Sequence, residues 1–271
     1  MLSSMASKPI SSPDAAIDSL MQRLHKSPAF IAGSCAAAAA HGHSSFHDVD
    51  VFVPSQGALF TAIQQLLDQG YYLDDRFDRV WHRWVRYGFK NWHTNSMRLY
   101  SPENIETNIV YKLVDGHPTT SLTQVLESFD FGLLGVGYEV ETQTYYDLRP
   151  YLFKGYDPQV GGPLPMMPNK RDNWRNGFIS RYNGLREAAR LAKYYKYGYD
   201  MSMVMDDMAH GYRMAALYHL DQFDEDKQTL GEIYTVLADR IEADELDELD
   251  EAYRNEIGFN DPLADILNAL E

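Results

Sequence analysis

Two short apolar segments near the N-terminus constrain the fold of this chain more than any other feature. Residues 30–34 (FIAGS) predict a strand that ends in a tight Gly-Ser turn, and residues 48–53 (DVDVFV) predict a second strand. Between them, the alanine run at residues 36–40 favours a helix by propensity. A strand, a turn, a helix and a second strand in this order predict a domain that combines a β-sheet with helices.

The second predicted strand carries two aspartates on one face. Because residues i and i+2 of a strand point to the same side, Asp48 and Asp50 project together, while Val49, Val51 and Val53 face the other way. Two neighbouring carboxylates repel each other unless a cation lies between them. Mg²⁺ prefers such oxygen ligands and leaves room for substrate phosphates. The pair therefore predicts a metal site suited to phosphoryl or nucleotidyl transfer.

Composition and charge narrow the class of protein. The chain has 271 residues and 45% hydrophobic residues, which predicts a packed protein of one large domain or two ordinary ones. The net charge is −15, but residues 221–271 alone hold 17 acidic and 3 basic side chains. The first 220 residues are thus almost neutral, which is compatible with a nucleotide or RNA substrate and argues against broad, nonspecific DNA binding.

Cysteine content and the N-terminus predict the compartment. The single cysteine, Cys35, cannot form an internal disulfide, so a reducing cytoplasmic compartment is expected. No apolar run is long enough to span a bilayer. Residues 1–13 are rich in Ser and Pro and lack the apolar core of a signal peptide.

Periodicity predicts an α+β protein, with a small mixed sheet in a first domain and a helical second domain. Helices are predicted at residues 15–25, 58–67, 121–128, 174–197, 203–220, 230–240 and 246–257, and further strands at 79–89, 96–100, 107–113, 131–140 and 144–148. The Gly- and Pro-rich residues 155–168 indicate the boundary. The predicted domains are residues 1–158 and 159–271, the second with an acidic C-terminal part.

A Gly-Ser turn followed by a strand with Asp-x-Asp resembles the signature of the polymerase-β-like nucleotidyltransferase superfamily, which includes CCA-adding enzymes and poly(A) polymerases. Here Gly33 and Ser34 match the turn, and Asp48 and Asp50 match the metal-binding pair. Residues 128–131 (SFDF) resemble the Asp-Phe strand of CCA-adding enzymes, in a Phe-Asp-Phe form like that of phage-encoded nucleotidyltransferases. Residues 190–198 (RLAKYYKYG) resemble the later Lys-Tyr helix of that form.

The resemblance implies a reaction and a cytoplasmic setting, in a bacterial or phage-infected cell. It implies that the protein moves an NMP from an NTP such as ATP to an acceptor hydroxyl, such as an RNA or tRNA 3′ end, a protein side chain or a small molecule. Two Mg²⁺ ions would be bound by Asp48 and Asp50, with Asp130 as the third carboxylate and Glu106 as the reserve candidate.

The resemblance also implies a nucleotide site. The Gly33-Ser34 turn would hold the triphosphate at the start of a helix. The implied phosphate and base contacts come from Lys193, Tyr194 and Lys196. One departure concerns base selection: CCA-adding enzymes have arginines just before Asp-Phe, where this chain has Glu127 and Ser128. Selection of bases for CCA addition is therefore not implied.

Other interpretations of the same residues stay open. His41, His43 and His47 lie close together in sequence and form either a polar loop near the nucleotide or a zinc site of a metallohydrolase. Asp130 can instead brace a turn, and Lys193 and Lys196 can form a solvated helix face.

The protein as a whole also has an alternative role. A catalytically silent member of the same fold would bind a nucleotide, RNA or protein without transfer. Residues 79–92 interleave aromatic and basic side chains, which suits either stacking on RNA or packing against the sheet. The acidic helices after residue 224 form either a solvated face or a surface for a protein partner.

Overall fold

The computed structural model describes residues 12–25, 27–44, 46–74, 81, 96–114, 116–175, 181–208 and 210. The chain divides into two compact units, and each unit is made of two separate segments of the sequence. The first unit comprises Met1–Phe129 and Leu134–Leu148, and the second comprises Asp130–Leu133 and Arg149–Glu271. The domain boundary predicted after residue 158 stays a prediction.

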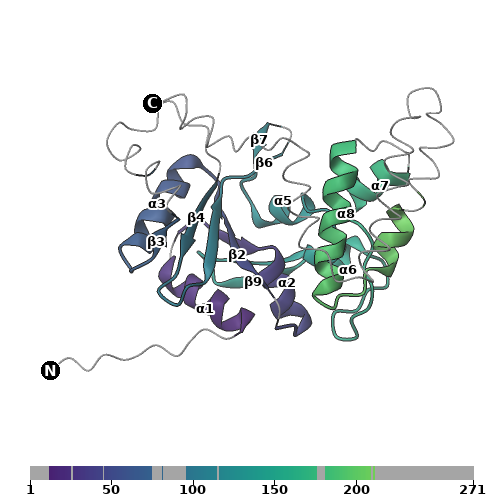
Figure 1. Cartoon of the computed structure of the whole chain (residues 1–271), viewed down its shortest axis with the longest axis horizontal. Coiled ribbons are helices and arrows are strands. Elements are labelled where there is room, and N and C mark those ends of the chain that lie inside the picture. Colours follow the sequence, from purple (N-terminus) through teal and green to yellow (C-terminus); the bar gives the residue numbers. More distant parts are fainter. Residues whose placement is uncertain are drawn as a thin grey trace. The chain divides into compact units, whose positions relative to one another are not determined.

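The first unit is built on a seven-stranded sheet with the order β3-β4-β5-β2-β1-β8-β9 (Figure 1). Its strands are β1 (Phe30–Ala32), β2 (Asp48–Phe52), β3 (Tyr72–Leu73), β4 (Ser96–Tyr100), β5 (Glu106–Val110), β8 (Val136–Glu139) and β9 (Thr144–Asp147). All neighbouring strands are antiparallel except β2 and β5, which run parallel. A separate two-stranded ribbon pairs β6 (Leu113–Val114) with β7 (His117–Pro118).

Three helices of this unit begin with the same serine cap. They are α1 (Pro13–Arg23), α3 (Gln56–Leu67) and α5 (Leu122–Glu127). Each follows a serine, Ser12, Ser55 or Ser121, whose hydroxyl oxygen accepts the backbone N–H three residues on. This bond satisfies one of the N–H groups that a helix start leaves without an intrahelical partner. Helix α2 (Ser34–His41) instead begins after Gly33, without a side-chain cap.

The core of the first unit lies between the sheet and these helices. Helix α2 packs on β1, β2 and β8, α1 packs on α2, α3 packs on β5, and α5 packs on β1 and β8. Strand β2 alternates between half-exposed aspartates and fully buried Val49 and Val51. Ile63 of α3 and Ile109 of β5 are also fully buried. The alternation fixes which face of β2 is covered and which face carries its carboxylates.

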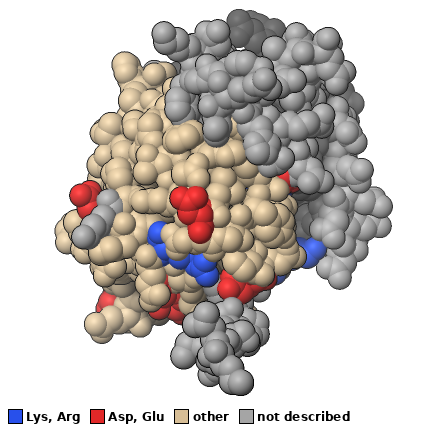
Figure 2. Space-filling model, turned by 90° about the vertical axis from the view of Figure 1, so that its left-hand side faces the viewer, with Lys and Arg blue, Asp and Glu red and all other residues tan. Residues whose placement is uncertain are grey.

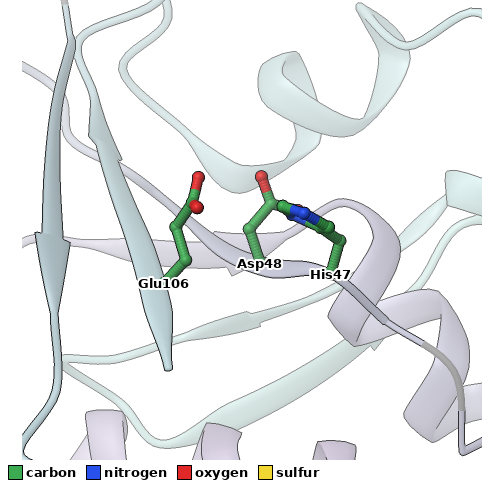
Figure 3. A group of neighbouring side chains, drawn as sticks. All are labelled: His47, Asp48 and Glu106. Carbon is green, nitrogen blue, oxygen red and sulfur yellow. The ribbon is translucent and has the colours of Figure 1, made fainter. Parts of the chain in front are cut away.

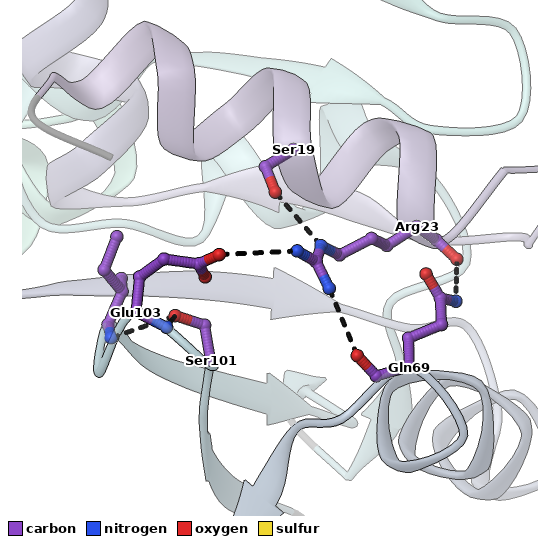
Figure 4. Close-up of polar contacts among 6 residues, drawn as sticks. Ser19, Arg23, Gln69, Ser101 and Glu103 are labelled. Carbon is purple, nitrogen blue, oxygen red and sulfur yellow. Dashed lines mark hydrogen bonds and ion pairs between the residues drawn. The ribbon is translucent and has the colours of Figure 1, made fainter. Parts of the chain in front are cut away.

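Arg23 at the end of α1 links three parts of the first unit (Figure 4). Its guanidinium donates to Ser19 Oγ at 3.1 Å and to the backbone oxygen of Gln69 at 3.3 Å, and it lies 3.7 Å from Glu103 Oε1. Gln69 Nε2 donates back to the Arg23 carbonyl at 2.8 Å. The guanidinium also lies 5.2 Å from the centre of the Tyr71 ring. The contacts tie α1 to the end of α3 and to the turn between β4 and β5.

The second unit buries acidic side chains against basic ones. Its helices are α6 (Arg149–Leu152), α7 (Pro168–Arg175) and α8 (Arg181–Lys196). Asp130 is 1% exposed and forms ion pairs with Lys170 and Arg190. Asp207 is 3% exposed and accepts from Arg171 at 2.9 Å. Two consecutive basic residues of α7 thus neutralise two different buried carboxylates.

The predicted combination of a mixed sheet and helices is confirmed by these elements. One predicted strand start is wrong: Gly132–Leu134 form a 3₁₀ turn, and β8 begins only at Val136. Phe131 pairs instead with Met166 in an isolated bridge. A Cβ on Gly132 would lie 2.7 Å from the Phe153 ring, so the segment packs too closely at this position for any residue larger than glycine.

Several predicted elements lie outside the described residues. They are the strand at 79–89 apart from Trp81, and the helices and acidic region after residue 210. Trp81 has helical backbone, is buried, and stacks on Phe60 with the ring centres 4.8 Å apart. This contact favours packing for Trp81 over stacking on RNA.

The described surface gives two further observations. Within the described part of the chain, no helix combines the length and the apolar character that crossing a membrane requires. On the face drawn in Figure 2, basic and acidic side chains lie next to each other, and neither sign covers a broad area. Among the described residues of that face, the basic side chains do not form the continuous surface that a nonspecific nucleic-acid binder presents.

Candidate metal and nucleotide site

Asp48 and Asp50 project from the half-exposed face of β2, as the alternation predicted. The parallel partner β5 brings two more polar side chains to the same place. In the register of the pair, Asp48 lies opposite Glu106 and Asp50 lies opposite Asn108. Glu106-x-Asn108 thus repeats the spacing of Asp48-x-Asp50 on the neighbouring strand, and four polar side chains form a block on one face.

Three of the side chains around this block offer ligand atoms that lie close together. His47, Asp48 and Glu106 each provide one nitrogen or oxygen atom within 4.8 Å of the other two. Figure 3 shows the three side chains pointing into a common space, Glu106 from one strand and His47 and Asp48 from the start of another. His47 is exposed, and the two acids are half-exposed. Among the described residues, this is the one group of three or more His, Cys, Asp or Glu with such spacing.

The amide of Asn108 lies between the two aspartates. Its Nδ2 donates to Asp48 Oδ2 at 2.6 Å and points to Asp50 Oδ1 at 3.4 Å. An N–H donor between two carboxylates lowers their mutual repulsion in the same way as a cation, although less strongly. Asn108 therefore holds Asp48 and Asp50 together.

Glu106 is oriented from the other side by β4. Arg98 Nε lies 2.8 Å from Glu106 Oε1. A carboxylate has two oxygens, so Glu106 can bind Arg98 through Oε1 and still present Oε2. Arg98 and Glu106 therefore form an ion pair across the neighbouring strands β4 and β5.

The Gly33-Ser34 turn brings the start of helix α2 to these carboxylates. Gly33 has φ 85° and ψ −152°, a conformation that is essentially restricted to glycine. A Cβ at this position would lie 2.6 Å from Asp50 Oδ2. Ser34 is buried, and its hydroxyl donates to Asp48 Oδ1 at 3.4 Å. Both aspartates thus contact the turn, where the helix dipole favours negative charge.

Cys35, the next residue, does not offer a reactive thiol. Its side chain is fully buried, and Sγ lies 3.7 Å from the Pro13 carbonyl oxygen. Burial, reinforced by the charges of Asp50 and Asp48, raises the pKa of the thiol far above its ordinary value. Burial and the two carboxylates therefore disfavour the thiolate form that a nucleophile needs.

The three histidines do not act as one group. His47 joins the carboxylates, whereas the rings of His41 and His43 lie 6.3 Å apart at the end of α2 and outside the cluster of potential ligands. A zinc site made by all three histidines is therefore not formed within the described residues.

The remaining predicted site residues, Asp130, Lys193, Tyr194 and Lys196, belong to the second unit. Asp130 is bound by Arg190 and Lys170, which gives its carboxylate two cationic partners within that unit. Lys193 Nζ lies 5.8 Å from the centre of the Tyr197 ring, and Lys196 is exposed. The catalytic role of Asp130 and the nucleotide contacts of the two lysines stay predictions.

Tyr194 is a packing residue of the second unit. It is 6% exposed, and its ring contacts Phe131, Tyr197 and Tyr199 edge-on at centre distances of 5.9, 6.2 and 5.8 Å. Its predicted stacking on a nucleotide stays a prediction, and this burial does not favour it.

The donor set fits a divalent cation. Carboxylate oxygens on two adjacent strands, with a hydroxyl and an amide beside them, are the ligands that hard cations prefer. Sequence reasoning named Glu106 as the reserve candidate, did not single out Asn108, and grouped His47 with His41 and His43. The signal that could have found the first two is the Glu-x-Asn spacing at the start of a predicted strand.

Comparisons with known proteins give similarity at the level of structure only. No protein-family model matches the chain, and no curated protein matches it. Similar solved structures include a CCA-adding enzyme in complex with CTP, with 9% identity and a TM-score of 0.45 over 76% of this chain and 44% of that chain. Others are a tRNA-processing enzyme in an apo form, with 13% identity and a TM-score of 0.45 over 78% of this chain and 49% of that chain, and the Thermotoga maritima CCA-adding enzyme complexed with tRNA, with 11% identity and a TM-score of 0.44 over 73% of this chain and 42% of that chain.

CCA-adding enzymes, to which the sequence resemblance pointed, are thus among the solved structures similar to this chain. The chain spans less than half the length of each of these three proteins. Since every TM-score is below 0.5, the function has to be inferred from the residues of the site.

Proposed function

We propose that this protein is a metal-dependent nucleotidyltransferase that moves an NMP from an NTP to an acceptor hydroxyl, such as an RNA 3′ end. The observation that supports this most is the block on β2 and β5, which sets Asp48, Asp50 and Glu106 beside the Gly33-Ser34 turn. The resemblance of the turn and the Asp-x-Asp strand to nucleotidyltransferases points to the same reaction.

Three carboxylates and a helix start serve this chemistry together. The N–H groups in the first turn of α2 bind phosphate oxygens, and the dipole of the helix favours the added negative charge. Asp50 lies against the same turn, so triphosphate and carboxylate repel each other unless a cation separates them. Nucleotide binding should therefore require a divalent ion.

The carboxylates hold that ion and orient the reacting groups. Two bound ions of Mg²⁺ or of a similar dication would serve the reaction. One would lower the pKa of the attacking hydroxyl, and the other would neutralise charge on the leaving pyrophosphate. The contacts of Asp48 with both Ser34 and Asn108 support a role for it as the shared ligand. Glu106, directly opposite Asp48, is our preferred third carboxylate, and Asp130 is the alternative.

Transfer of label from α-³²P-NTPs into RNA, protein and small-molecule fractions tests the proposal. We expect transfer by the wild-type protein and a loss of at least about 100-fold in Asp48→Asn and Asp50→Asn, because each removes a metal ligand and keeps the side-chain shape. Glu141→Gln, a change at an exposed acid in the β8–β9 turn, is the control and should keep full activity. Full transfer by both aspartate variants would refute the assignment.

A second pair of variants separates the two candidates for the third carboxylate. Glu106→Gln should abolish transfer and lower the stability of the first unit by only about 1 kcal/mol or less, because the Arg98 charge that it leaves is partly exposed to solvent. Asp130→Asn should instead lower the stability of the second unit by about 1–3 kcal/mol, because it leaves the Arg190 and Lys170 charges without their buried partner. Loss of transfer in Asp130→Asn at an unchanged melting temperature would reverse our preference.

One observation favours a second candidate function, nucleotide binding without transfer. The Asn108 amide already lies between Asp48 and Asp50, and a carboxylate there would give a fuller metal site. A protein of this kind would show metal-dependent stabilisation by NTPs and no label transfer to any acceptor.

A further inference from the structure

The imidazole of His47 is the one member of the ligand cluster that a magnesium site does not explain. It lies immediately before β2, is exposed to solvent, and offers a ring nitrogen within 4.8 Å of the oxygens of Asp48 and Glu106. Figure 3 shows the ring directed into the space between the two strands rather than away from it. His47 thus places a nitrogen ligand beside two oxygen ligands.

The spacing of the three ligand atoms suits one ion. A six-coordinate dication binds nitrogen and oxygen ligands at about 2.1 Å, so two ligand atoms on opposite sides of it are about 4.2 Å apart. The three atoms here are all within 4.8 Å of one another. At that limit the three atoms lie about 2.8 Å from their common centre, so side-chain movements of about 0.7 Å or less bring all three to one ion, with the remaining positions left for water or phosphate oxygens.

The chemistry of the set distinguishes between ions. Mg²⁺ binds oxygen ligands, loses its waters reluctantly and gains little from an imidazole. First-row transition-metal dications accept imidazole nitrogen together with carboxylate oxygen. One nitrogen and two carboxylates thus favour a transition metal over Mg²⁺.

We propose that His47, Asp48 and Glu106 bind a first-row divalent transition-metal ion, and that His47 gives this site its preference for that ion over Mg²⁺. The inference deepens the proposed function, because it names the ion for the same carboxylates. Asp48 is one of the three ligands and also contacts Asn108 and Ser34. The ion would therefore lie at the end of the β2–β5 block where Asp48 is opposite Glu106.

Binding of Mn²⁺ to the full-length protein without nucleotide is the direct test. Titration followed by electron paramagnetic resonance gives the affinity, since protein-bound Mn²⁺ loses the sharp six-line signal of the free ion. Competition with Mg²⁺ gives the selectivity. Electron spin echo modulation from ¹⁴N then reports whether a ring nitrogen is bound to the ion, a signal that carboxylates alone cannot give.

Matched histidine variants make the test specific. His47→Gln should lower Mn²⁺ affinity about 10-fold or more and change Mg²⁺ affinity less than about 2-fold, with loss of the ¹⁴N modulation. His43→Gln, outside the cluster, should leave both affinities and the modulation unchanged. Asp48→Asn should lose most of the binding of both ions.

The outcomes separate this inference from the proposed function. Equal Mn²⁺ affinity in His47→Gln and wild type, or wild-type Mn²⁺ without ¹⁴N modulation, overturns the inference and leaves nucleotidyl transfer standing. Absence of Mn²⁺ binding by the wild type also overturns it. His47-dependent Mn²⁺ binding without any label transfer supports the inference and overturns the proposed reaction.

Discussion

Two glycines bound helix α2, and both have positive φ, 85° at Gly33 and 67° at Gly42. Their surroundings differ. A Cβ on Gly33 would meet Asp50 Oδ2 at 2.6 Å, whereas a Cβ on Gly42 would meet no atom within 4 Å. Substitution strains the backbone at both positions, more at Gly33 because its ψ of −152° lies outside the left-handed helical region of Gly42. Contact with the site is specific to Gly33, so ion binding is the measurement that separates the two.

Gly33→Ala should lower the free energy of unfolding by at least about 2 kcal/mol and weaken divalent-ion binding, because the methyl group displaces Asp50. Gly42→Ala should cost about 1 kcal/mol from strain alone and leave ion binding unchanged. Urea unfolding and metal titration of both variants check this. Equal effects of the two substitutions on ion binding would show that the contact with Asp50 is unimportant.

At the scale of single residues, the sequence predicts the site residues of β2 well and those of β5 poorly. Alternation in DVDVF places Asp48 and Asp50 on one face of β2 without knowledge of any other strand. That Glu106 and Asn108 face them depends on the parallel register of β5, a pairing between residues far apart in sequence. No local pattern encodes such a register, so Glu106 could only be a reserve candidate.

Among the elements, α1 is attached to the sheet by the contacts of Arg23 rather than by its apolar face alone. Arg23 and Glu103 are 23% and 11% exposed, so their ion pair is only partly screened by water. Arg23→Met keeps an apolar stem for packing on Tyr71 and removes the charge.

A double-mutant cycle with Arg23→Met and Glu103→Gln should give a coupling free energy of about 0.5–1 kcal/mol from thermal or urea unfolding. The coupling should fall in 1 M salt, because added ions screen a partly exposed pair. A coupling near zero at low salt would mean that the Gln69 and Ser19 contacts account for the attachment of α1.

Helices and hairpins were predictable where local signals agree. Ser12, Ser55 and Ser121 each cap a helix that the periodicity had predicted. The β8–β9 hairpin also follows from alternation interrupted by a short polar turn. Phe131, in contrast, was predicted as the start of a strand, and its actual partner, Met166, lies outside any local pattern.

At the scale of the whole molecule, the phenols of buried Tyr71 and half-buried Tyr138 make the stability depend on alkaline pH. Burial raises the pKa of Tyr71 to about 12, against the opposing effect of the Arg23 guanidinium. Burial, with help from Tyr145, raises the pKa of Tyr138 to about 12. In the unfolded chain both groups lose their protons near pH 10, about two pH units earlier.

Since the folded state holds these protons more tightly, their contribution to stability is complete below pH 10 and is lost as the pH rises from about 10 to about 12. A variant with Tyr71→Phe and Tyr138→Phe should therefore lose less stability than wild type over that range. Urea midpoints at pH 9, 10 and 11 check this. Parallel pH profiles for the two proteins would contradict it.

The unit structure could be predicted only in part. Composition indicates a mixed-sheet part followed by helices, and the Gly- and Pro-rich residues 155–168 suggest a place for the boundary. Inclusion of Asp130–Leu133 in the second unit depends on contacts with residues further along the chain, such as the Asp130–Arg190 ion pair. Sequence order alone does not reveal such an exchange.

The parallel pairing of β2 with β5 also has a kinetic consequence. Asp48 and Asn108 are 60 residues apart, so their strands meet only after a long loop has closed. Strands β8 and β9, joined by a tight turn, can pair much earlier. The ion site should therefore be absent from the transition state for folding, and a bound divalent ion should slow unfolding while leaving the folding rate nearly unchanged. Stopped-flow measurements with and without the ion would show one limb of the chevron plot shift and the other stay in place.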